Sequence, residues 1–280
     1  VANSHILNGE TTPALHHAAQ VLRTVPDYDA ILFSSLDPFL PNPEPLLAAI
    51  GDDRRATRAY AEFFLRTNLL SKAEKVWNHL FTKDFHDGAL TRTYLEALLA
   101  AHRYAQATQT WAAYLGPKRA GDYPSLNLIF NGGFEADNPE SAPLNWRVEP
   151  NDDFDTTRDP TTARSGRHSL RITFKGSGNV SYNHVRQVVP LPAGQYRLTA
   201  WAKTKNITTN EGPRLAVDGL NSDSLTGTSD WTPLELRFQL PEPKAIVVHI
   251  VRTPSQKFDN KIEGTVWLDD FVIHKNRESP

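Results

Sequence analysis

The stretch Asn127-Leu-Ile-Phe-Asn-Gly-Gly-Phe-Glu135 opens the C-terminal half of the chain, and Thr265-Val-Trp-Leu-Asp-Asp-Phe-Val-Ile273 closes it. Between them lie about a dozen short runs that alternate polar and apolar residues, as in 169–174 and 196–203, separated by turn residues. Alternation with a period of two is typical of half-buried strands, and strands joined by short turns predict an antiparallel β-sandwich. No helical pattern of any length interrupts residues 127–275.

The N-terminal half has a different periodicity, because residues 52–116 repeat after 34 positions. The repeated pairs are Arg58 and Arg92, Tyr60 and Tyr94, Glu62 and Glu96, Ala73 and Ala107, and Trp77 and Trp111. Apolar residues at helical spacing predict two helices in each unit, at roughly 53–67 and 71–82 and at roughly 88–101 and 104–115. Further helices are expected near 12–25 and 43–50, and the two repeated tryptophans are expected in the core between stacked helices.

The polar segment 118–125 contains glycine and proline and separates the helical pattern from the strand pattern. It predicts two domains, a helical domain over 1–118 and a β-sandwich domain over 119–280. The fold class is therefore a multidomain chain with helical hairpins first and an antiparallel β-sandwich second.

The composition is that of a soluble globular protein, with 280 residues, 39% of them hydrophobic, and a net charge of −2. Balanced charge argues against a nucleic-acid-binding face, and no apolar run reaches the ~20 residues that cross a bilayer. The chain has no cysteine, which excludes disulfides, thiol catalysis and cysteine-based zinc sites, and it has no methionine. A chain that begins at Val1 is therefore interpreted as a mature product that has lost a signal peptide or a membrane anchor; the alternative is an end without targeting meaning.

The 34-residue helix–turn–helix period resembles the tetratricopeptide repeat. The small residue of that motif is matched by Ala73 and Ala107, and the large residue four positions later by Trp77 and Trp111. The glycine usual in the first helix is missing, and so is the proline usual at position 85. The resemblance implies a surface that docks a protein partner; a spacer or packing platform for the β-domain is the alternative.

The C-terminal half resembles the carbohydrate-binding modules of families 4, 9 and 22, which are β-jelly rolls akin to galactose-binding-like domains. The resemblance is carried by five phrases in the same order, at 127–135, 165–172, 187–203, 228–238 and 267–273. It implies a jelly roll that engages a glycan and carries no catalytic residues.

Sugar rings stack on aromatic side chains, and their hydroxyl groups form hydrogen bonds with arginine, amide and imidazole groups. The candidate ligand-binding residues are Trp201, Tyr182, Arg186, Gln187 and His249. Strand alternation predicts that Trp201 stands on the polar face of its strand, and that Tyr182 and Arg186 share one face of theirs. In the competing interpretation, Trp201 covers the sheet or packs against the helical half, and Tyr182 lies on an edge strand.

Three carboxylates at the two ends of the β-domain form a candidate cation site: Glu135, Asp270 and Asp269. The family resemblance brings these ends together, and oxygen ligands of this kind suit a structural Ca²⁺. Alternation groups Asp269 with Phe271 and Asp270 with Leu268, and Asp270 is favoured as the ligand. The alternative is that these carboxylates cap turns and pair with arginine or lysine.

The sequence nominates no catalytic residue. It lacks the Gly-x-Ser-x-Gly motif, and the acidic run 151–155 is interpreted as a solvated loop rather than as part of an acid–base pair. The favoured interpretation is a non-enzymatic, exported, periplasmic or envelope-associated protein of bacterial type that links a polysaccharide or oligosaccharide to a protein partner. By analogy it would serve polysaccharide assembly or export. The alternatives are an assembly protein whose jelly roll binds no sugar, and an accessory part of a glycoside-active enzyme.

Overall fold

A computed structural model describes residues 11–136 and 143–276 of the chain. The chain divides into two compact units, Val1–Leu98 and Leu99–Pro280. The first unit is helical, and the second contains one helix, α8 (Tyr104–Ala120), together with all the described strands. The division lies before the polar segment at which the sequence places the boundary, because α8 belongs to the same unit as the β-sandwich.

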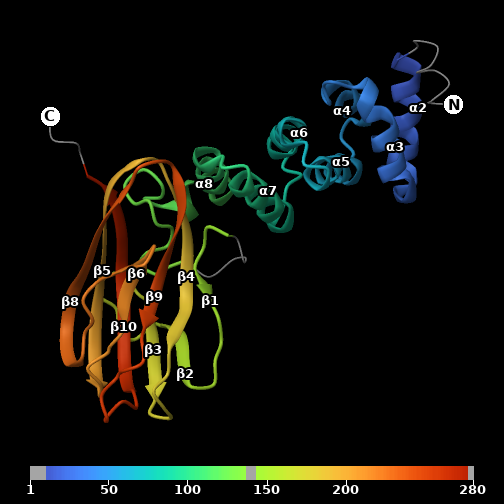
Figure 1. The fold of residues 1–280 in the computed structure, drawn as a ribbon. Helices are drawn as coiled ribbons and strands as arrows, with labels where there is room; N and C mark the ends of the chain where they lie inside the picture. The colour runs from blue at the N-terminus through green and yellow to red at the C-terminus, as the bar shows by residue number, and fades with distance from the viewer. Residues whose placement is uncertain (1–10, 137–142, 277–280) are drawn as a thin grey trace. The chain divides into compact units, whose positions relative to one another are not determined.

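The helices confirm the predicted helical half (Figure 1). They are α2 (Thr11–Thr24), α3 (Asp29–Leu36), α4 (Glu44–Ile50), α5 (Arg54–Arg66), α6 (Leu70–Thr82) and α7 (Gly88–Ala100), with 3₁₀ turns η1 (Pro26–Tyr28) and η2 (Asp37–Phe39). Helix α8 changes direction at Gly116, which lies outside the helical region (φ 68°), just before Pro117. Among the described helices, none has both the length and the apolarity that crossing a bilayer requires.

The 34-residue period is visible in how the helices begin. Helices α5 and α7 each have 13 residues, and their first residues are 34 positions apart. Each is capped by an aspartate: Asp53 accepts a hydrogen bond from the Ala56 N–H (2.8 Å), and Asp87 accepts one from the Leu90 N–H (2.9 Å). An N-cap carboxylate satisfies one of the free amide groups of a first turn, so both repeats fix their helix start in the same way.

The two repeated tryptophans are buried, as predicted. Trp77 stacks on Tyr94 with 4.6 Å between the ring centroids. Trp111, on α8, meets the ring of Phe130 edge-on at 5.6 Å. Trp111 therefore packs against the stretch that opens the β-domain, and this contact helps to join α8 to the sandwich.

The described strands form two sheets that face each other, which confirms the predicted antiparallel sandwich (Figure 1). Sheet A has the order β1 (Arg147–Val148), β4 (Tyr182–Leu191), β9 (Lys244–Arg252), β6 (Arg214–Val217) and β7 (Leu220–Asn221). Sheet B has the order β2 (Phe154–Asp159), β3 (Ser169–Lys175), β10 (Glu263–Lys275), β5 (Gly194–Ile207) and β8 (Gly227–Leu240). Strands β5 and β8 pair along most of their 14 residues each, so they are longer than the alternating runs indicate.

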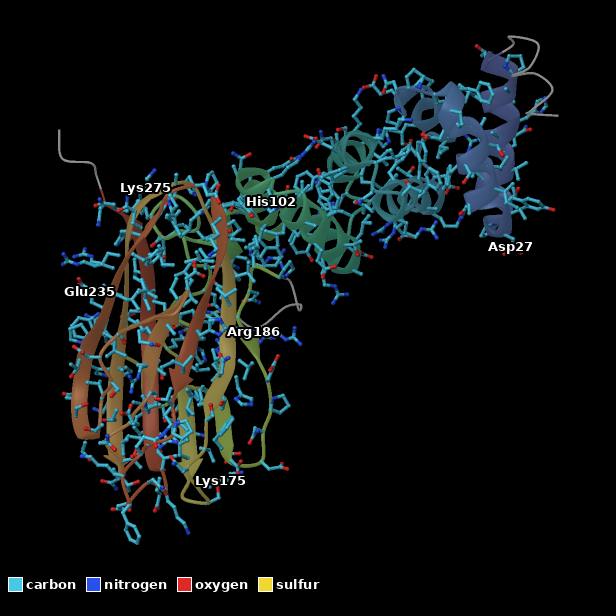
Figure 2. The ribbon with its side chains drawn as sticks, viewed as in Figure 1. Asp27, His102, Lys175, Arg186, Glu235 and Lys275 are labelled. Atoms are coloured by element: carbon cyan, nitrogen blue, oxygen red, sulfur yellow. The ribbon has the colours of Figure 1, made fainter. Side chains whose placement is uncertain are left out.

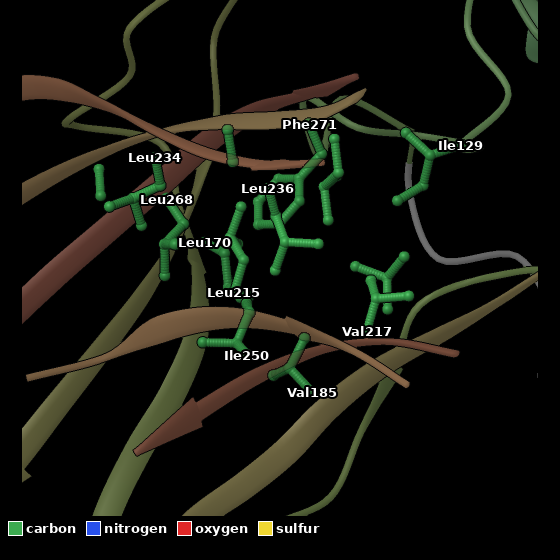
Figure 3. Close-up of a cluster of buried hydrophobic side chains, with 14 of the residues drawn as sticks. Ile129, Leu170, Val185, Leu215, Val217, Leu234, Leu236, Ile250, Leu268 and Phe271 are labelled. Carbon is green, nitrogen blue, oxygen red and sulfur yellow. The ribbon is translucent and has the colours of Figure 1, made fainter. Parts of the chain in front are cut away.

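The core lies between the sheets and is built from the apolar half of each alternating strand (Figure 3). Leu170, Leu236 and Leu268 reach it from sheet B, and Val185 and Ile250 reach it from sheet A. Burial of aliphatic side chains contributes roughly 1.5–3 kcal/mol for each one. This two-sided apolar layer therefore accounts for the alternation in the sequence.

The opening and closing phrases lie side by side. The Asn127 amide donates to the Phe271 carbonyl (2.8 Å) and accepts from the Ile273 N–H (3.1 Å). The backbone of Gly132 passes so close that an added Cβ would lie 2.0 Å from the Phe271 oxygen, so only glycine fits there. Trp146 packs against the Phe271 ring (4.9 Å between centroids), which seals the junction. The two phrases therefore close the sandwich at one place.

Candidate functional site

Two of the five candidate ligand residues, Arg186 and His249, are directly opposite each other on strands β4 and β9 of sheet A. Their neighbours along the strands, Gln187 and Val248, are buried between the sheets. Because successive side chains of a strand point to opposite faces, Arg186 and His249 project from the outer face of sheet A. Figure 2 shows Arg186 on β4.

The row continues on β1, where Arg147 lies directly opposite Arg186. We call Arg147, Arg186 and His249 the Arg/His row. One oxygen of Glu149, Oε1, contacts both arginines. It accepts a hydrogen bond from Arg186 Nη2 (2.8 Å) and forms an ion pair with Arg147 Nε (3.2 Å). The side chain of Arg147 is 69% exposed and that of Arg186 is 35% exposed, so both guanidinium groups are open to a ligand.

His249 is held by Asn183, whose Oδ1 lies 2.6 Å from His249 Nδ1. With this oxygen as acceptor, the proton of the neutral ring sits on Nδ1, and Nε2 is left as an acceptor. Burial, and secondly the charge of Arg186, lower the pKa of His249 below its ordinary value. The ring is therefore neutral at neutral pH and can accept a hydrogen bond from a ligand.

Tyr182 does not belong to this face, which corrects the prediction that it shares a face with Arg186. The register between β4 and β9 shifts between Tyr182 and Val185, which marks a bulge. One extra residue in a strand moves the following side chains to the other face, so Tyr182 points inward while Arg186 points outward. Tyr182 is 1% exposed, its hydroxyl is paired with Thr156 Oγ1 (2.9 Å), and burial raises its pKa above the usual range.

Gln187 also points into the interior, so its prediction as a surface ligand residue is wrong. Its amide accepts from the Phe130 N–H (3.1 Å) and donates to the Phe130 carbonyl (2.9 Å). Both polar groups of the amide are therefore used to fasten the opening stretch of the β-domain to β4. A buried amide whose donor and acceptor are both paired is a structural residue.

Trp201 lies on β5 of sheet B, away from the Arg/His row, and stands opposite Asp269 and Pro233. It is half-buried. The guanidinium of Arg164 lies over its ring, 3.8 Å from the centroid. The interpretation in which Trp201 covers the sheet matches this arrangement, because the ring face that a sugar would stack on is already covered by a cation.

A second tryptophan of sheet B, Trp267, is held by Asp159. The indole N–H of Trp267 donates to Asp159 Oδ2 (2.8 Å), and Thr161 donates to Oδ1 through its N–H (2.8 Å) and its hydroxyl (2.6 Å). Burial alone would raise the pKa of Asp159, but these hydrogen bonds and the charge of Arg171 hold the pKa at about 2. Asp159 is therefore ionised at neutral pH and fixes the indole against the sheet.

The candidate cation residues gather around the loop that carries Ser165 and Gly166. Glu135 Oε1 accepts from the N–H groups of Arg167 (2.6 Å) and His168 (2.9 Å), and Oε2 lies 3.1 Å from the His168 ring. Burial acts to raise the pKa of Glu135, but the Arg167 N–H and His168 outweigh it and lower the pKa below the ordinary value. Glu135 thus clamps one end of this loop.

Asp269 clamps the other end of the loop, since its Oδ2 accepts from the N–H groups of Arg164 (2.8 Å) and Ser165 (3.2 Å). Asp270 pairs with Arg164 Nη1 (2.5 Å) and accepts from the Ser165 hydroxyl (2.6 Å). Burial, with the charge of Asp270 adding to it, raises the pKa of Asp269 to about 6 despite these N–H donors. A bulge in β10, with Asp270 at a φ of 49°, sends Phe271 into the core with Leu268, which corrects the predicted grouping of Asp269 with Phe271.

These carboxylates converge on Gly133 but are engaged by protein donors. An added Cβ at Gly133 would lie 3.6 Å from Asp269 Oδ1 and 3.9 Å from Asp270 Oδ1. Among the described residues, no group of three or more metal-ligating side chains has the arrangement of a metal site. The donors already present match the alternative in which the carboxylates cap the loop and pair with Arg164, and Ca²⁺ at this place stays a prediction.

Sequence reasoning missed Arg147, Glu149 and Asn183. Strand β1 has only two residues, which is too short for a visible alternation, so Arg147 and Glu149 gave no signal. Asn183 lies inside the bulge of β4, where Asn183 and His184 stand between the inward-facing Tyr182 and Val185, and the extra residue is recognised only after the register is known.

No protein-family model and no curated protein matches this chain. Solved structures do match it over the β-sandwich. TmCBM61 in complex with β-1,4-galactotriose has 22% identity and a TM-score of 0.38, covering 54% of this chain and 100% of its own. The CBM22-1 xylan-binding domain of Paenibacillus barcinonensis Xyn10C has 13% identity and a TM-score of 0.36, covering 53% and 94%. The C-terminal family 22 carbohydrate-binding module of Clostridium thermocellum Xyn10B has 14% identity and a TM-score of 0.35, covering 54% and 97%.

Proposed function

We propose that the β-sandwich binds a carbohydrate, without catalysis, on the outer face of sheet A through Arg186 and His249. The observation that carries this proposal is that these two candidate residues are cross-strand partners on one face and keep open hydrogen-bonding capacity. Arg186 engages one protein acceptor through its side chain within the described residues, and the Nε2 of His249 points to no described partner. Sugar hydroxyls both donate and accept, so a guanidinium beside a neutral imidazole complements them.

The surroundings of the pair also suit a sugar ring. Val188 and Val247 stand opposite each other one outward position further along, and both are half-buried. Small apolar side chains next to polar ones match a ring that has C–H groups and hydroxyls side by side. The sheet offers no stacking ring, because Tyr182, the one Trp, Tyr or Phe in its strands, is buried. The expected affinity is therefore modest.

The test is a glycan array followed by calorimetry on the chain and two variants. Arg186→Ala combined with His249→Ala is expected to weaken binding of any carbohydrate hit by about tenfold or more, since each lost hydrogen bond to a charged or buried group contributes roughly 1–3 kcal/mol. The control is Arg237→Ala on strand β8 of sheet B, an exposed arginine paired with Glu235. An array without any hit, or equal losses in the control and the double variant, would contradict the proposal.

A second proposed role is contact between the helical unit and a protein partner in an extracytoplasmic setting. Its support is that three large apolar side chains of this unit are exposed: Tyr28 (52%), Ile31 (60%) and Phe39 (56%). Exposed apolar residues that form a contiguous patch are typical of contact surfaces, and these three lie within 12 positions of the chain. A photo-crosslinker at position 31 is expected to capture one defined protein in cells, whereas the same group at the exposed Asp84 captures none. Equal capture from both positions would refute this role.

A further inference from the structure

The Arg/His row contains an uncompensated positive charge. Arg147 and Arg186 are directly opposite each other across β1 and β4, and like charges in that position destabilise a sheet. One carboxylate, Glu149, contacts both guanidinium groups. His249 adds no charge to the row, because its ring is neutral at neutral pH. Two cations therefore share one anion in this row.

One further carboxylate, Asp218, is near enough to affect the pKa of His249. It is engaged elsewhere, because it pairs with Lys244 at 2.6 Å. Within the described part of the chain, nothing besides Glu149 neutralises the two arginines of the row. The outer face of sheet B also has two facing arginines, Arg197 and Arg237, with Glu235 paired to Arg237. In the Arg/His row of sheet A, by contrast, the one carboxylate contacts both arginines and a neutral imidazole lies beside them.

From this charge we propose that the Arg/His row binds an acidic carbohydrate, with the carboxylate of a uronic acid taking hydrogen bonds from Arg147 and Arg186. The inference rests on the proposed carbohydrate-binding function and names its ligand class. A guanidinium holds a carboxylate through two parallel N–H bonds, and Glu149 occupies a small part of the donors of either arginine.

The shape of the face supports the same ligand class. The row crosses three adjacent strands, a span of about 10 Å, which is the scale of a short oligosaccharide. The strands of sheet A contain one Tyr and no Trp or Phe, and that residue, Tyr182, is buried. Charge pairing would therefore supply the affinity that stacking on an aromatic ring would otherwise give. The Nε2 of His249 then accepts from a hydroxyl of the adjoining sugar.

The probes are matched pairs of oligosaccharides bound to the full chain. Oligomers of galacturonate, glucuronate and mannuronate are each compared with the same oligomer after its carboxylates have been reduced to alcohols. At least one acidic oligomer is expected to bind about tenfold more tightly than its reduced partner at roughly 50 mM salt, and the difference should shrink at roughly 500 mM because added ions screen exposed charges. Equal or tighter binding of the reduced member in every pair that binds would overturn the inference.

Charge variants decide whether the row is responsible. Arg147→Gln and Arg186→Gln are each expected to weaken binding of the acidic oligomer by about fivefold or more, and Glu149→Gln to strengthen it, because an internal competitor is removed. Arg237→Gln, which makes the same charge change on sheet B, should leave the affinity unchanged. If Arg237→Gln weakens binding as much as Arg186→Gln does, the charge acts diffusely and the row is not the site.

The outcomes separate this inference from the function on which it rests. If neutral oligosaccharides on a broad array bind and no acidic one does, the ligand class is wrong and the carbohydrate-binding function stands. If no carbohydrate of either kind binds, both fail. Thermal midpoints of all variants near that of the parent chain show that a loss of binding is not a loss of folding.

Discussion

Replacing Asp159 by asparagine is expected to destabilise the sandwich at neutral pH and to have little effect in acid. Asp159 is 2% exposed and receives hydrogen bonds from the Trp267 indole and from Thr161, with Arg171 at 3.3 Å. All of these donors favour the ionised form. An asparagine keeps one acceptor oxygen, but its NH₂ group would face donors that now have no acceptor.

The magnitude follows from the pKa of Asp159, which is held at about 2 instead of 3.8. One pKa unit corresponds to 1.36 kcal/mol, so the lowered pKa stabilises the fold by about 2 kcal/mol. Because the folded pKa lies below the unfolded value, this contribution is fully present above the unfolded pKa. It is lost as the pH falls through the folded pKa, where the carboxyl becomes protonated and resembles the amide of asparagine.

Urea denaturation of the full chain gives the test when unfolding of the β-sandwich is followed at roughly pH 7 and at roughly pH 2.5. Asp159→Asn should cost about 2 kcal/mol at the higher pH and less than about 1 kcal/mol at the lower one. The matched control is Asp155→Asn on the same strand, an exposed carboxylate 3.3 Å from Lys175, which should change stability by less than about 0.5 kcal/mol. A pH-independent loss in Asp159→Asn, or a carboxyl carbon signal that titrates near 3.8, would refute the reasoning.

Three further predictions concern the loop and sheet B. Gly166→Ala should lower the stability of the sandwich by about 1 kcal/mol more than Gly219→Ala. Both glycines have positive φ, but the new Cβ at 166 would lie 2.2 Å from Glu135 Oε1. Thermal melts of the two variants compare them, and equal losses of stability would count against the clash. If Ca²⁺ binds at Glu135, a chelator lowers the thermal midpoint of the parent chain and not that of Glu135→Gln. An unchanged midpoint of the parent chain would refute Ca²⁺ binding at this place. Trp201→Ala should leave the carbohydrate affinity measured by calorimetry unchanged and should lower the stability of the sandwich by about 1 kcal/mol. A loss of affinity would show that Trp201 takes part in carbohydrate binding.

The fold could be predicted because it follows from a periodic burial pattern. The alternation in 169–174 places Leu170, Ile172 and Phe174 inside, and the structure buries all three. Likewise, a repeat of 34 residues placed the starts of α5 and α7 close to their observed residues. Period and burial are properties of a whole segment, so an error at one residue does not change them.

The candidate site depended on the face to which single residues point, and two bulges altered that. The bulge before Val185 turned Tyr182 inward, and the bulge at Asp270 turned Phe271 inward. A single extra residue reverses every later side chain in the strand, so a prediction from alternation fails wherever the register shifts. The outward position of Arg186 therefore follows from the observed register and not from the predicted alternation, which put it on the same face as Tyr182.

The tryptophans of sheet B and the Arg/His row of sheet A differ in how completely the protein itself uses their side chains. On sheet B, the Trp267 indole is bonded to Asp159 and the ring of Trp201 is covered by Arg164, so these groups stabilise the fold and have little left to offer a ligand. On sheet A, two arginines share one carboxylate and His249 keeps a free acceptor, at some cost to the sheet. Side chains that the fold leaves incompletely satisfied on an open face are those that a ligand can satisfy. For this reason the proposed carbohydrate site lies on sheet A, although the half-buried tryptophans lie on sheet B.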